Sequence, residues 1–123
     1  MKTVLVVDDD RYCRLNIIAF LEDSGFIVVG EGTNGKEAFE KYCSLRPDLV
    51  IMDLLMPNYS GFEGLQWIKE HDRMSKVVIM SGDHSVMTRE QARAKGSDMY
   101  ITKPVDLDLL ERILNDLQGG FSK

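Results

Sequence analysis

The sequence has only two cysteines, two histidines and three prolines, and it has no apolar run long enough to cross a membrane. A membrane-spanning helix needs about 20 consecutive apolar residues, so we expect no attachment to a membrane. The first residues, Met1–Asp8, also lack the apolar length and the small-residue cleavage site of a secretory signal. These absences predict a cytoplasmic protein.

Cysteine chemistry has little support in the sequence. Cys13 and Cys43 both fall within segments that have helical spacing, and neither belongs to a CxxC motif or a Cys/His cluster. We therefore expect two reduced, partly buried thiols rather than a disulfide or a metal site.

The sequence also has fewer basic than acidic residues. The chain has 15 lysines and arginines against 20 aspartates and glutamates, a net charge of -5. An acidic domain repels the phosphate backbone, so direct binding to nucleic acid is not expected. The 123 residues, 44% of them hydrophobic, suit a single domain with a real core. We expect one domain over residues 1–123, with its core at about 2–118 and a short tail at 119–123.

Short apolar runs recur along the chain and predict five strands. Their continuous apolar character, without alternation, is typical of strands that are covered on both faces of a sheet. The runs are Val4–Val7, Phe26–Val29, Leu49–Met52, Val77–Met80 and Met99–Ile101.

The segments between and after these runs have the spacing of helices that pack on a sheet. They are Arg11–Asp23, Lys36–Leu45, Gly61–Glu70, His84–Lys95 and Asp106–Gln118. The fourth segment has the least apolar area, so we expect it to be the easiest helix to shift. Strict alternation of strands and helices predicts an α/β fold, a flavodoxin-like (βα)5 doubly wound parallel sheet. By analogy with that fold, the expected strand order is 2-1-3-4-5.

Polar residues stand where the predicted strands end. In such a sheet ligands bind beyond the carboxyl ends of the strands, at the switch point between strands 1 and 3. Asp8 and Asp9 follow the first strand, Asp53 the third, Ser81 the fourth, and Lys103 comes shortly after the fifth. Carboxylates at close range repel one another and call for a hard cation, for which Mg²⁺ is suited. A carboxylate can also attack phosphorus, while a lysine and a hydroxyl bind phosphoryl oxygens.

Four short motifs occur in order, each at the end of a predicted strand. They are Val6-Val7-Asp8-Asp9, Asp53-Leu54-Leu55-Met56-Pro57 with Gly61, Met80-Ser81-Gly82, and Lys103-Pro104. With them the chain resembles the receiver domain of bacterial response regulators, proteins of two-component signal transduction that include the chemotaxis receivers. The resemblance covers essentially all of Lys2 to Leu117.

The resemblance implies a role for each acidic residue of the motifs. Asp53 is similar to the phosphoacceptor of the family. Asp8 and Asp9 are similar to the acidic pair that positions Mg²⁺, with Asp53 as the third carboxylate ligand. The backbone carbonyl of Leu55 matches the position that completes the metal shell.

The resemblance also implies a switch. Ser81 corresponds to the hydroxyl that contacts the phosphoryl group, Lys103 to the lysine that binds it, and Tyr100 to the aromatic residue that turns inward when the hydroxyl moves. The bond from Lys103 to Pro104 is cis in the family, and X-Pro is the common place for such a bond.

The family further implies partners and an output. A sensor histidine kinase or histidine phosphotransfer protein is expected to donate the phosphoryl group and to dock near Tyr12 and Asn16. We expect the face formed by the fourth helix, the fifth strand and the last helix to dock a partner or a second copy of the chain. Such a protein is not an enzyme in the ordinary sense, since it catalyses only its own phosphorylation and dephosphorylation.

Two positions depart from the pattern of the family. Leu55 places a large apolar side chain where many relatives have a polar one, and Asp83 puts a carboxylate two residues beyond Ser81. An apolar Leu55 would hinder an attacking water, while Asp83 would orient a water or repel the phosphate. The lifetime of the phosphorylated state stays open on these grounds.

Alternative interpretations concern the same aspartates. Asp10 is interpreted as a residue of a helix start, where acids are favoured. The run from Val7 to Asp10 also fits the opening of haloacid-dehalogenase-type phosphatases, with Asp8 as nucleophile and Asp10 as acid/base. That alternative leaves Asp53 unexplained, and 123 residues leave no room for a cap. A third interpretation is a receiver that is never phosphorylated and serves only as an interaction module.

Overall fold

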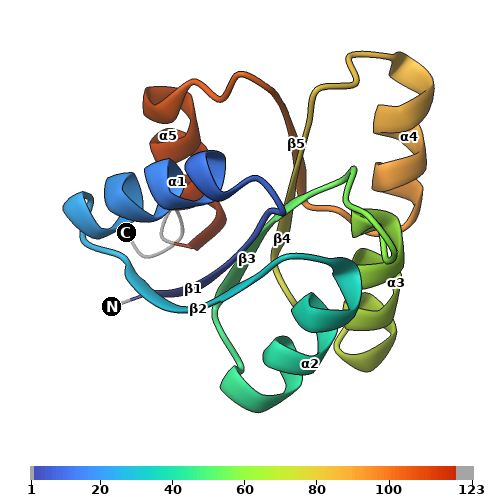
Figure 1. Cartoon of the computed structure of the whole chain (residues 1–123), viewed down its shortest axis with the longest axis horizontal. Helices are drawn as coiled ribbons and strands as arrows, with labels where there is room; N and C mark the ends of the chain where they lie inside the picture. Colours follow the sequence, from blue (N-terminus) through green and yellow to red (C-terminus); the bar gives the residue numbers. More distant parts are fainter. Residues whose placement is uncertain (1, 119–123) are drawn as a thin grey trace.

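Strands and helices alternate along residues 2–118, the part of the chain that the computed structural model describes (Figure 1). The strands are β1 (Thr3–Val7), β2 (Ile27–Gly32), β3 (Leu49–Asp53), β4 (Val77–Ser81) and β5 (Met99–Thr102). The helices are α1 (Arg11–Asp23), α2 (Gly35–Leu45), α3 (Gly61–His71), α4 (Val86–Ala94) and α5 (Leu107–Gln118). The expected tail at 119–123 lies outside the described residues. Within residues 2–118, none of the helices combines the length and the apolar character that crossing a membrane requires.

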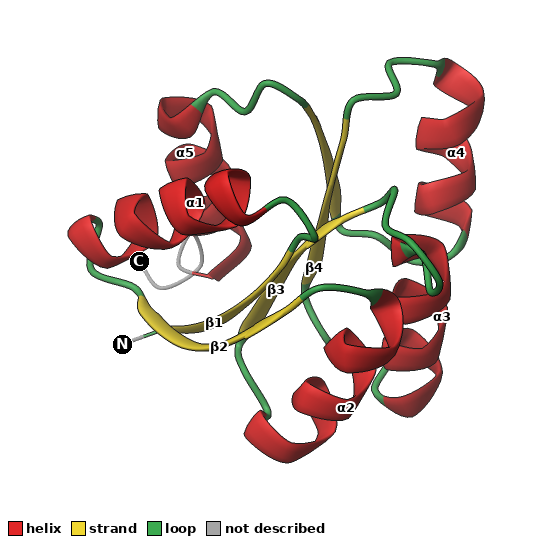
Figure 2. Ribbon diagram, in the orientation of Figure 1, coloured by secondary structure: helices red, strands yellow, loops and turns green. Residues whose placement is uncertain are grey.

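The five strands form one parallel sheet in the order β2-β1-β3-β4-β5, which confirms the predicted topology. Helices α1 and α5 lie on one side of the sheet, and α2 and α3 lie on the other (Figure 2). β1 and β3 are neighbours although a helix, a strand and a second helix separate them in the sequence. This pairing creates the switch point at which the winding of the chain reverses.

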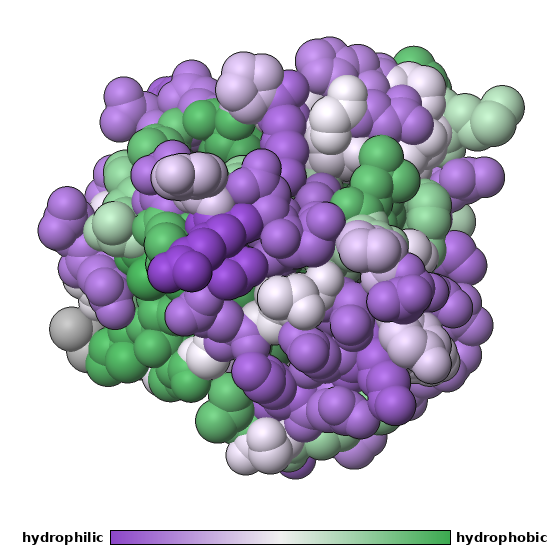
Figure 3. All heavy atoms as spheres, viewed as in Figure 1, coloured by the Kyte–Doolittle hydropathy of each residue, from purple (hydrophilic) through white to green (hydrophobic). Residues whose placement is uncertain are grey.

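The core has two layers because successive side chains of a strand point to opposite faces. Val4 and Val6 pack towards α1 and α5, whereas Leu5 and Val7 pack towards α2 and α3. With these side chains inside, the face of the molecule in Figure 3 is mostly hydrophilic.

The prediction that every strand is covered on both faces was wrong for the two edge strands. β3 and β4 are buried along their whole length, as are Val4–Val7 of β1. β2 and β5 leave Ile27 and Met99 exposed. An edge strand has a neighbour on only one side, so the flanking helices cover it less completely.

Side-chain caps set where several helices begin. Asp10 accepts hydrogen bonds from the backbone N–H groups of Tyr12 and Cys13, which confirms its interpretation as a residue of a helix start. Asp106 accepts from the N–H of Leu109 and so caps α5, which begins at Leu107. These caps satisfy amide groups that have no partner inside the helix.

Helix α4 is shorter than predicted and weakly anchored. It begins after the cap Ser85 and buries only Ala92. Val86 and Met87, in its first turn, are 73% and 72% exposed. The prediction of little buried apolar area is therefore confirmed.

Helices α2 and α3 approach each other closely at two glycines. A Cβ atom on Gly35 would lie 2.2 Å from the carbonyl oxygen of Ser60, and one on Gly64 would lie 3.0 Å from the Cα of Gly35. The N–H of Gly35 also donates to the carbonyl of Tyr59 at 2.7 Å. This hydrogen bond holds the start of α2 against the loop between β3 and α3, which directly follows Asp53.

We expect Gly35→Ala to lower the free energy of unfolding by about 1–3 kcal/mol, the usual cost of forcing extra volume into a packed contact. Urea denaturation of the two proteins measures the difference. Gly82→Ala is the matched control, because a Cβ there would meet nothing within 4 Å. Equal midpoints for the wild type and Gly35→Ala would show that the two helices can move apart freely.

Candidate functional site

Three carboxylates meet at the carboxyl ends of β1 and β3. Because Val7 pairs with Met52 across the two strands, the residues that follow them, Asp8 and Asp53, emerge side by side. One oxygen each from Asp8, Asp9 and Asp53 lies within 4.8 Å of the others. Asp8 is fully buried, Asp53 is 6% exposed and Asp9 faces solvent. The structure thus brings together the acidic residues that the sequence singled out.

The ammonium group of Lys103 bridges two of these carboxylates. Its Nζ lies 3.0 Å from Oδ2 of Asp8 and 3.3 Å from Oδ2 of Asp53. Two like charges 4 Å apart repel by roughly 4 kcal/mol at an effective dielectric of 20, and the lysine offsets part of that repulsion. The Lys103–Pro104 bond is cis, as the resemblance implied.

The electrostatics of the site follow from burial and from these contacts. Burial raises the pKa of Asp53 to about 6; the charge of Lys103 opposes that rise, and the charge of Asp8 adds to it. Burial alone would lower the pKa of Lys103, but the hydrogen bond to Asp8 and the charges of both carboxylates raise it above its ordinary value. The lysine is therefore held as a cation, while Asp53 takes up a proton at a higher pH than an ordinary aspartate does.

Ser81 ends β4 next to this cluster. It is fully buried, and its carbonyl accepts from the backbone N–H of Lys103 at 2.8 Å. Its Oγ accepts from the N–H of Asp83 at 3.0 Å. The hydroxyl proton is therefore not needed for that bond and is available for another acceptor.

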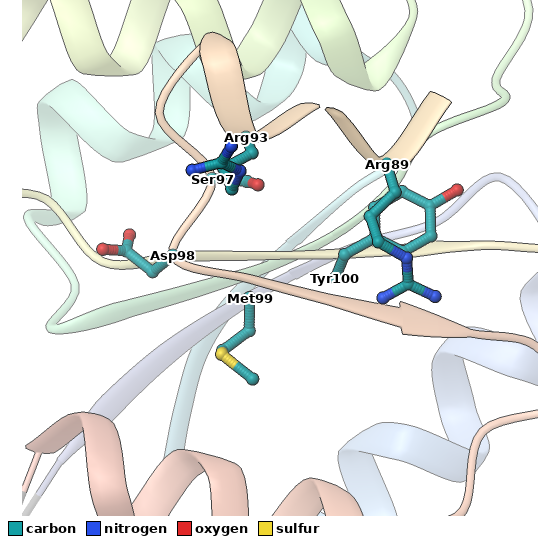
Figure 4. A pocket seen from close by; sticks show the side chains of 6 residues that line it. All are labelled: Arg89, Arg93, Ser97, Asp98, Met99 and Tyr100. Atoms are coloured by element: carbon teal, nitrogen blue, oxygen red, sulfur yellow. The ribbon is translucent and has the colours of Figure 1, made fainter. Parts of the chain in front are cut away.

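Tyr100 lies on β5 and is tied to the loop that follows Ser81. Its hydroxyl donates to the carbonyl of Asp83 at 2.7 Å. The guanidinium of Arg89, on α4, lies 4.9 Å from the centre of the tyrosine ring, and Figure 4 shows the two side chains against each other. Tyr100 thus contacts both the loop after Ser81 and helix α4.

Leu55 follows Asp53 by two residues and is 64% exposed. Its backbone carbonyl as a metal ligand stays a prediction.

Sequence reasoning missed two residues of α1 that support the site. Arg14 donates to the backbone carbonyl of Asp8 at 2.7 Å and pairs with Glu31 at 2.7 Å. Burial, followed by the hydrogen bond to Asp8, raises the pKa of Cys13 to about 11, so the thiol stays neutral. Both residues lie one turn after the helix start, on the side that faces β1. Helical spacing from Asp10 could have placed them there. Cys13 and Cys43 are both free and partly buried.

The parallel sheet, with an acidic cluster and a lysine at its switch point, has the architecture expected of a receiver domain. The sequence matches the response regulator receiver domain family over residues 4–115. The chain therefore belongs to this family, whose members transmit signals in two-component systems.

Individual relatives are chemotaxis proteins and response regulators. The chain is 36% identical over 115 residues to the chemotaxis protein CheY of Thermotoga maritima, covering 93% of this chain and 95% of that protein. It is 36% identical over 117 residues to the response regulator Rre1 of Synechocystis, covering 94% of this chain and 51% of that protein.

Solved structures give the same result. The CheX-CheY-BeF3-Mg²⁺ complex of Borrelia burgdorferi matches with a TM-score of 0.91 at 25% identity, covering 94% of this chain and 88% of the matched chain. A CheY-like receiver domain protein of Methanospirillum hungatei matches with a TM-score of 0.86 at 29% identity, covering 95% and 94%.

The phosphatase alternative is not supported. The match to the receiver family covers 4–115, which includes the whole region that the alternative needed. The geometry gives the physical reason. Asp10, the supposed acid/base, uses its carboxylate to cap α1. Asp8, the supposed nucleophile, is fully buried, whereas Asp53 keeps some exposure.

We expect Asp53→Asn to raise the free energy of unfolding at pH 7, in buffer free of divalent metal, by roughly 1–2 kcal/mol after allowance for solvent screening. The folded-state pKa of Asp53 is raised from 3.8 to about 6. Between these values the folded protein binds a proton that the unfolded chain does not. The wild type therefore loses stability as the pH rises through this window. Above the window the buried carboxylate stays ionised, and the loss of stability is complete.

Urea denaturation of the wild type and of Asp53→Asn at pH 4 and pH 7 measures the effect. The advantage of Asp53→Asn should shrink towards pH 4. Asp10→Asn is the control, because asparagine caps a helix as well as aspartate does. A lower stability of Asp53→Asn at pH 7 would contradict the electrostatic account.

Proposed function

We propose that Asp53 accepts a phosphoryl group from a phosphohistidine of a sensor histidine kinase or a histidine phosphotransfer protein. A carboxylate oxygen of Asp53 forms a bond to phosphorus as the bond from phosphorus to the histidine nitrogen breaks, and the electron pair stays on the imidazole. One observation carries the proposal: the nearly buried carboxylate of Asp53 lies 3.3 Å from the ammonium of Lys103 and beside Asp8 and Asp9. Membership of the receiver family supports it.

The donor set fits Mg²⁺. Clustered carboxylate oxygens are hard ligands at an open edge, and Mg²⁺ binds through a few such ligands while it keeps several waters. Asp8, Asp9 and Asp53 would hold the ion, with the backbone carbonyl of Leu55. When bound, Mg²⁺ would neutralise negative charge on the carboxylates and the phosphoryl oxygens. The similar CheY of Borrelia burgdorferi, solved with BeF3 and Mg²⁺, supports this assignment.

Lys103 and Ser81 provide the remaining contacts to the phosphoryl group. The ammonium of Lys103 balances one negative charge, and the hydroxyl of Ser81 donates to a phosphoryl oxygen. Their part is positioning and charge neutralisation, which is the main contribution of proteins to phosphoryl transfer. The chain would catalyse only its own phosphorylation and dephosphorylation, and would not act as an enzyme on other substrates.

The output is a change in the surface formed by α4, β5 and α5. Movement of Ser81 towards the phosphoryl group would release Tyr100 inward and shift the population of two states. This α4-β5-α5 face exposes apolar side chains, namely Val86, Met87, Met99 and Leu109.

The donor protein would dock at α1, where Tyr12 is 83% exposed close to the site. A cytoplasmic location fits such a donor. The net charge of -5 argues against direct contact with nucleic acid.

Trapping of the phosphoprotein tests which aspartate is the acceptor. The protein is incubated with Mg²⁺ and a small acyl phosphate, reduced with borohydride and mapped by peptide mass spectrometry. We expect the label on Asp53, because it keeps some exposure whereas Asp8, the other carboxylate beside Lys103, is fully buried. Asp53→Asn should lose the label and Asp10→Asn should keep it. A label on Asp8 would contradict the proposal.

Calorimetry tests the metal site separately. We expect Mg²⁺ to bind the wild type and Asp9→Asn to weaken that binding by at least about tenfold, since a neutral amide replaces a negatively charged ligand. Asp10→Asn should bind as the wild type does, because Asp10 caps α1. Failure of the wild type to bind Mg²⁺ would favour a receiver that acts only as an interaction module.

A further inference from the structure

The short loop between β1 and α1 carries two of the three clustered carboxylates, and its backbone is held at several points. The N–H of Asp8 donates to the carbonyl of Gly32 on β2 at 3.0 Å, and the carboxylate of Asp8 accepts from the N–H of Asp10 at 2.9 Å. The carbonyl of Asp8 accepts from Nη1 of Arg14 at 2.7 Å. Asp8 is thus bound through both its backbone and its side chain, whereas Asp9 faces solvent.

The bond from Arg14 fixes the backbone on which Asp9 stands. The carbonyl of Asp8 and the N–H of Asp9 belong to one planar peptide group, because the C–N bond between them has partial double-bond character. A hydrogen bond that holds this carbonyl therefore sets the orientation of the whole group. Since the Asp9 side chain lies in solvent, its direction depends on that peptide group and not on packing.

Arg14 is in turn anchored to the sheet. Its Nε lies 2.7 Å from a carboxylate oxygen of Glu31, and its side chain is only 14% exposed. Glu31 belongs to β2 and pairs with Val6 of β1, so the anchor is part of the rigid core. The planar guanidinium donates to two acceptors at once, in a geometry that a single ammonium group does not reproduce.

We propose that Arg14 is a positioning residue of the candidate Mg²⁺ site, which holds the peptide group between Asp8 and Asp9 so that the Asp9 carboxylate stays beside those of Asp8 and Asp53. The inference rests on the proposed function, because it takes these carboxylates as ligands of the ion. Arg14 acts through a backbone carbonyl and is not itself a ligand, since a guanidinium has no acceptor to offer a cation.

Charge and position make opposite predictions for the loss of Arg14. A cation close to the site repels Mg²⁺, so electrostatics alone would make the ion bind more tightly once the arginine is replaced. Without the bond to the Asp8 carbonyl, the peptide group is free to turn, and Asp9 has to be ordered when the ion binds, at a cost in conformational entropy. We therefore expect weaker binding, opposite in direction to the effect of the charge.

Calorimetry of Mg²⁺ binding to the full chain measures this difference. We expect Arg14→Ala and Arg14→Lys each to weaken binding by about fivefold, which corresponds to the loss of one ordinary hydrogen bond. Arg14→Lys retains the charge but loses the guanidinium fork, so the two variants together exclude an effect of charge. Arg11→Ala is the control, because it removes the same charge from an exposed position of the same helix, and it should bind the ion at least as tightly as the wild type.

A second pair of variants tests the anchor on β2. Glu31→Gln and Glu31→Ala remove the same negative charge, but only glutamine keeps a side-chain oxygen that accepts from Nε of Arg14. We expect Glu31→Ala to bind Mg²⁺ about threefold more weakly than Glu31→Gln, because a hydrogen bond contributes this much when its loss is felt indirectly. Equal affinities of these two proteins would contradict the anchoring of Arg14 by Glu31.

Nuclear magnetic resonance of the metal-free protein shows whether the loop itself has loosened. From ¹⁵N relaxation we expect the Asp9 amide of the wild type to have an order parameter of about 0.85, typical of rigid backbone, and that of Arg14→Ala to fall towards roughly 0.6. The Asp9 amide of Arg11→Ala should stay as rigid as in the wild type. A general loss of stability would not confine the change to this loop.

The outcomes separate the role of Arg14 from the proposed function. A wild type that does not bind Mg²⁺ would overturn both. A wild type that binds the ion, together with an Arg14→Ala or Arg14→Lys protein that binds it as tightly or more tightly, would overturn the role of Arg14 alone. An Asp9 amide that stays rigid in Arg14→Ala would also overturn it, since weaker binding would then have another cause.

Discussion

The contact of the Lys103 ammonium with Asp8 and Asp53 is the interaction on which the site depends. Two nearly buried carboxylates at this distance would repel each other strongly, and without a cation one of them would hold a proton. Lys103 lets the carboxylates share one edge of the sheet. Its charge opposes the effect of burial, which still raises the pKa of Asp53 to about 6. A divalent cation and a phosphoryl group would complete the balance of charge.

The sheet makes that contact possible. β1 and β3 are neighbours, so Asp8 and Asp53 emerge together, and β4 pairs with β5 so that Ser81 lies opposite Thr102, next to Lys103. The N–H of Lys103 donates to the carbonyl of Ser81, which joins the loops that follow these strands. The rigid parallel core fixes the polar groups, while the weakly anchored α4 can respond to them. Rigidity at the site and freedom at one helix are the combination that a switch needs.

Most of the fold was predictable because the local patterns agree with one another. Continuous apolar runs located the strands, and helical spacing located the helices, with Arg11–Asp23 correct at both ends. Helix boundaries were missed by one or two residues, as at the start of α4, where a cap and not periodicity decides the boundary. The second strand extends to Gly32, three residues beyond its predicted end. The exposure of the edge strands was missed, because the residues of a strand do not show whether it lies at the edge or in the centre of the sheet. The site residues were identified by their positions after strands and by a family resemblance, whereas Arg14 and Cys13 were missed because their importance lies only in contacts to Asp8.

The sequence by itself determined the alternation of strands and helices, the membership of the receiver family and the order of the polar residues along the chain. Only the tertiary structure decided which of those polar groups touch. It alone showed that Lys103 reaches both carboxylates and that Asp83 binds Ser81, Tyr100 and Thr88 at once. The reason is that hydrogen bonds and ion pairs depend on distances of about 3 Å. Such distances between residues remote in sequence arise only when the sheet pairs its strands and the helices pack on it.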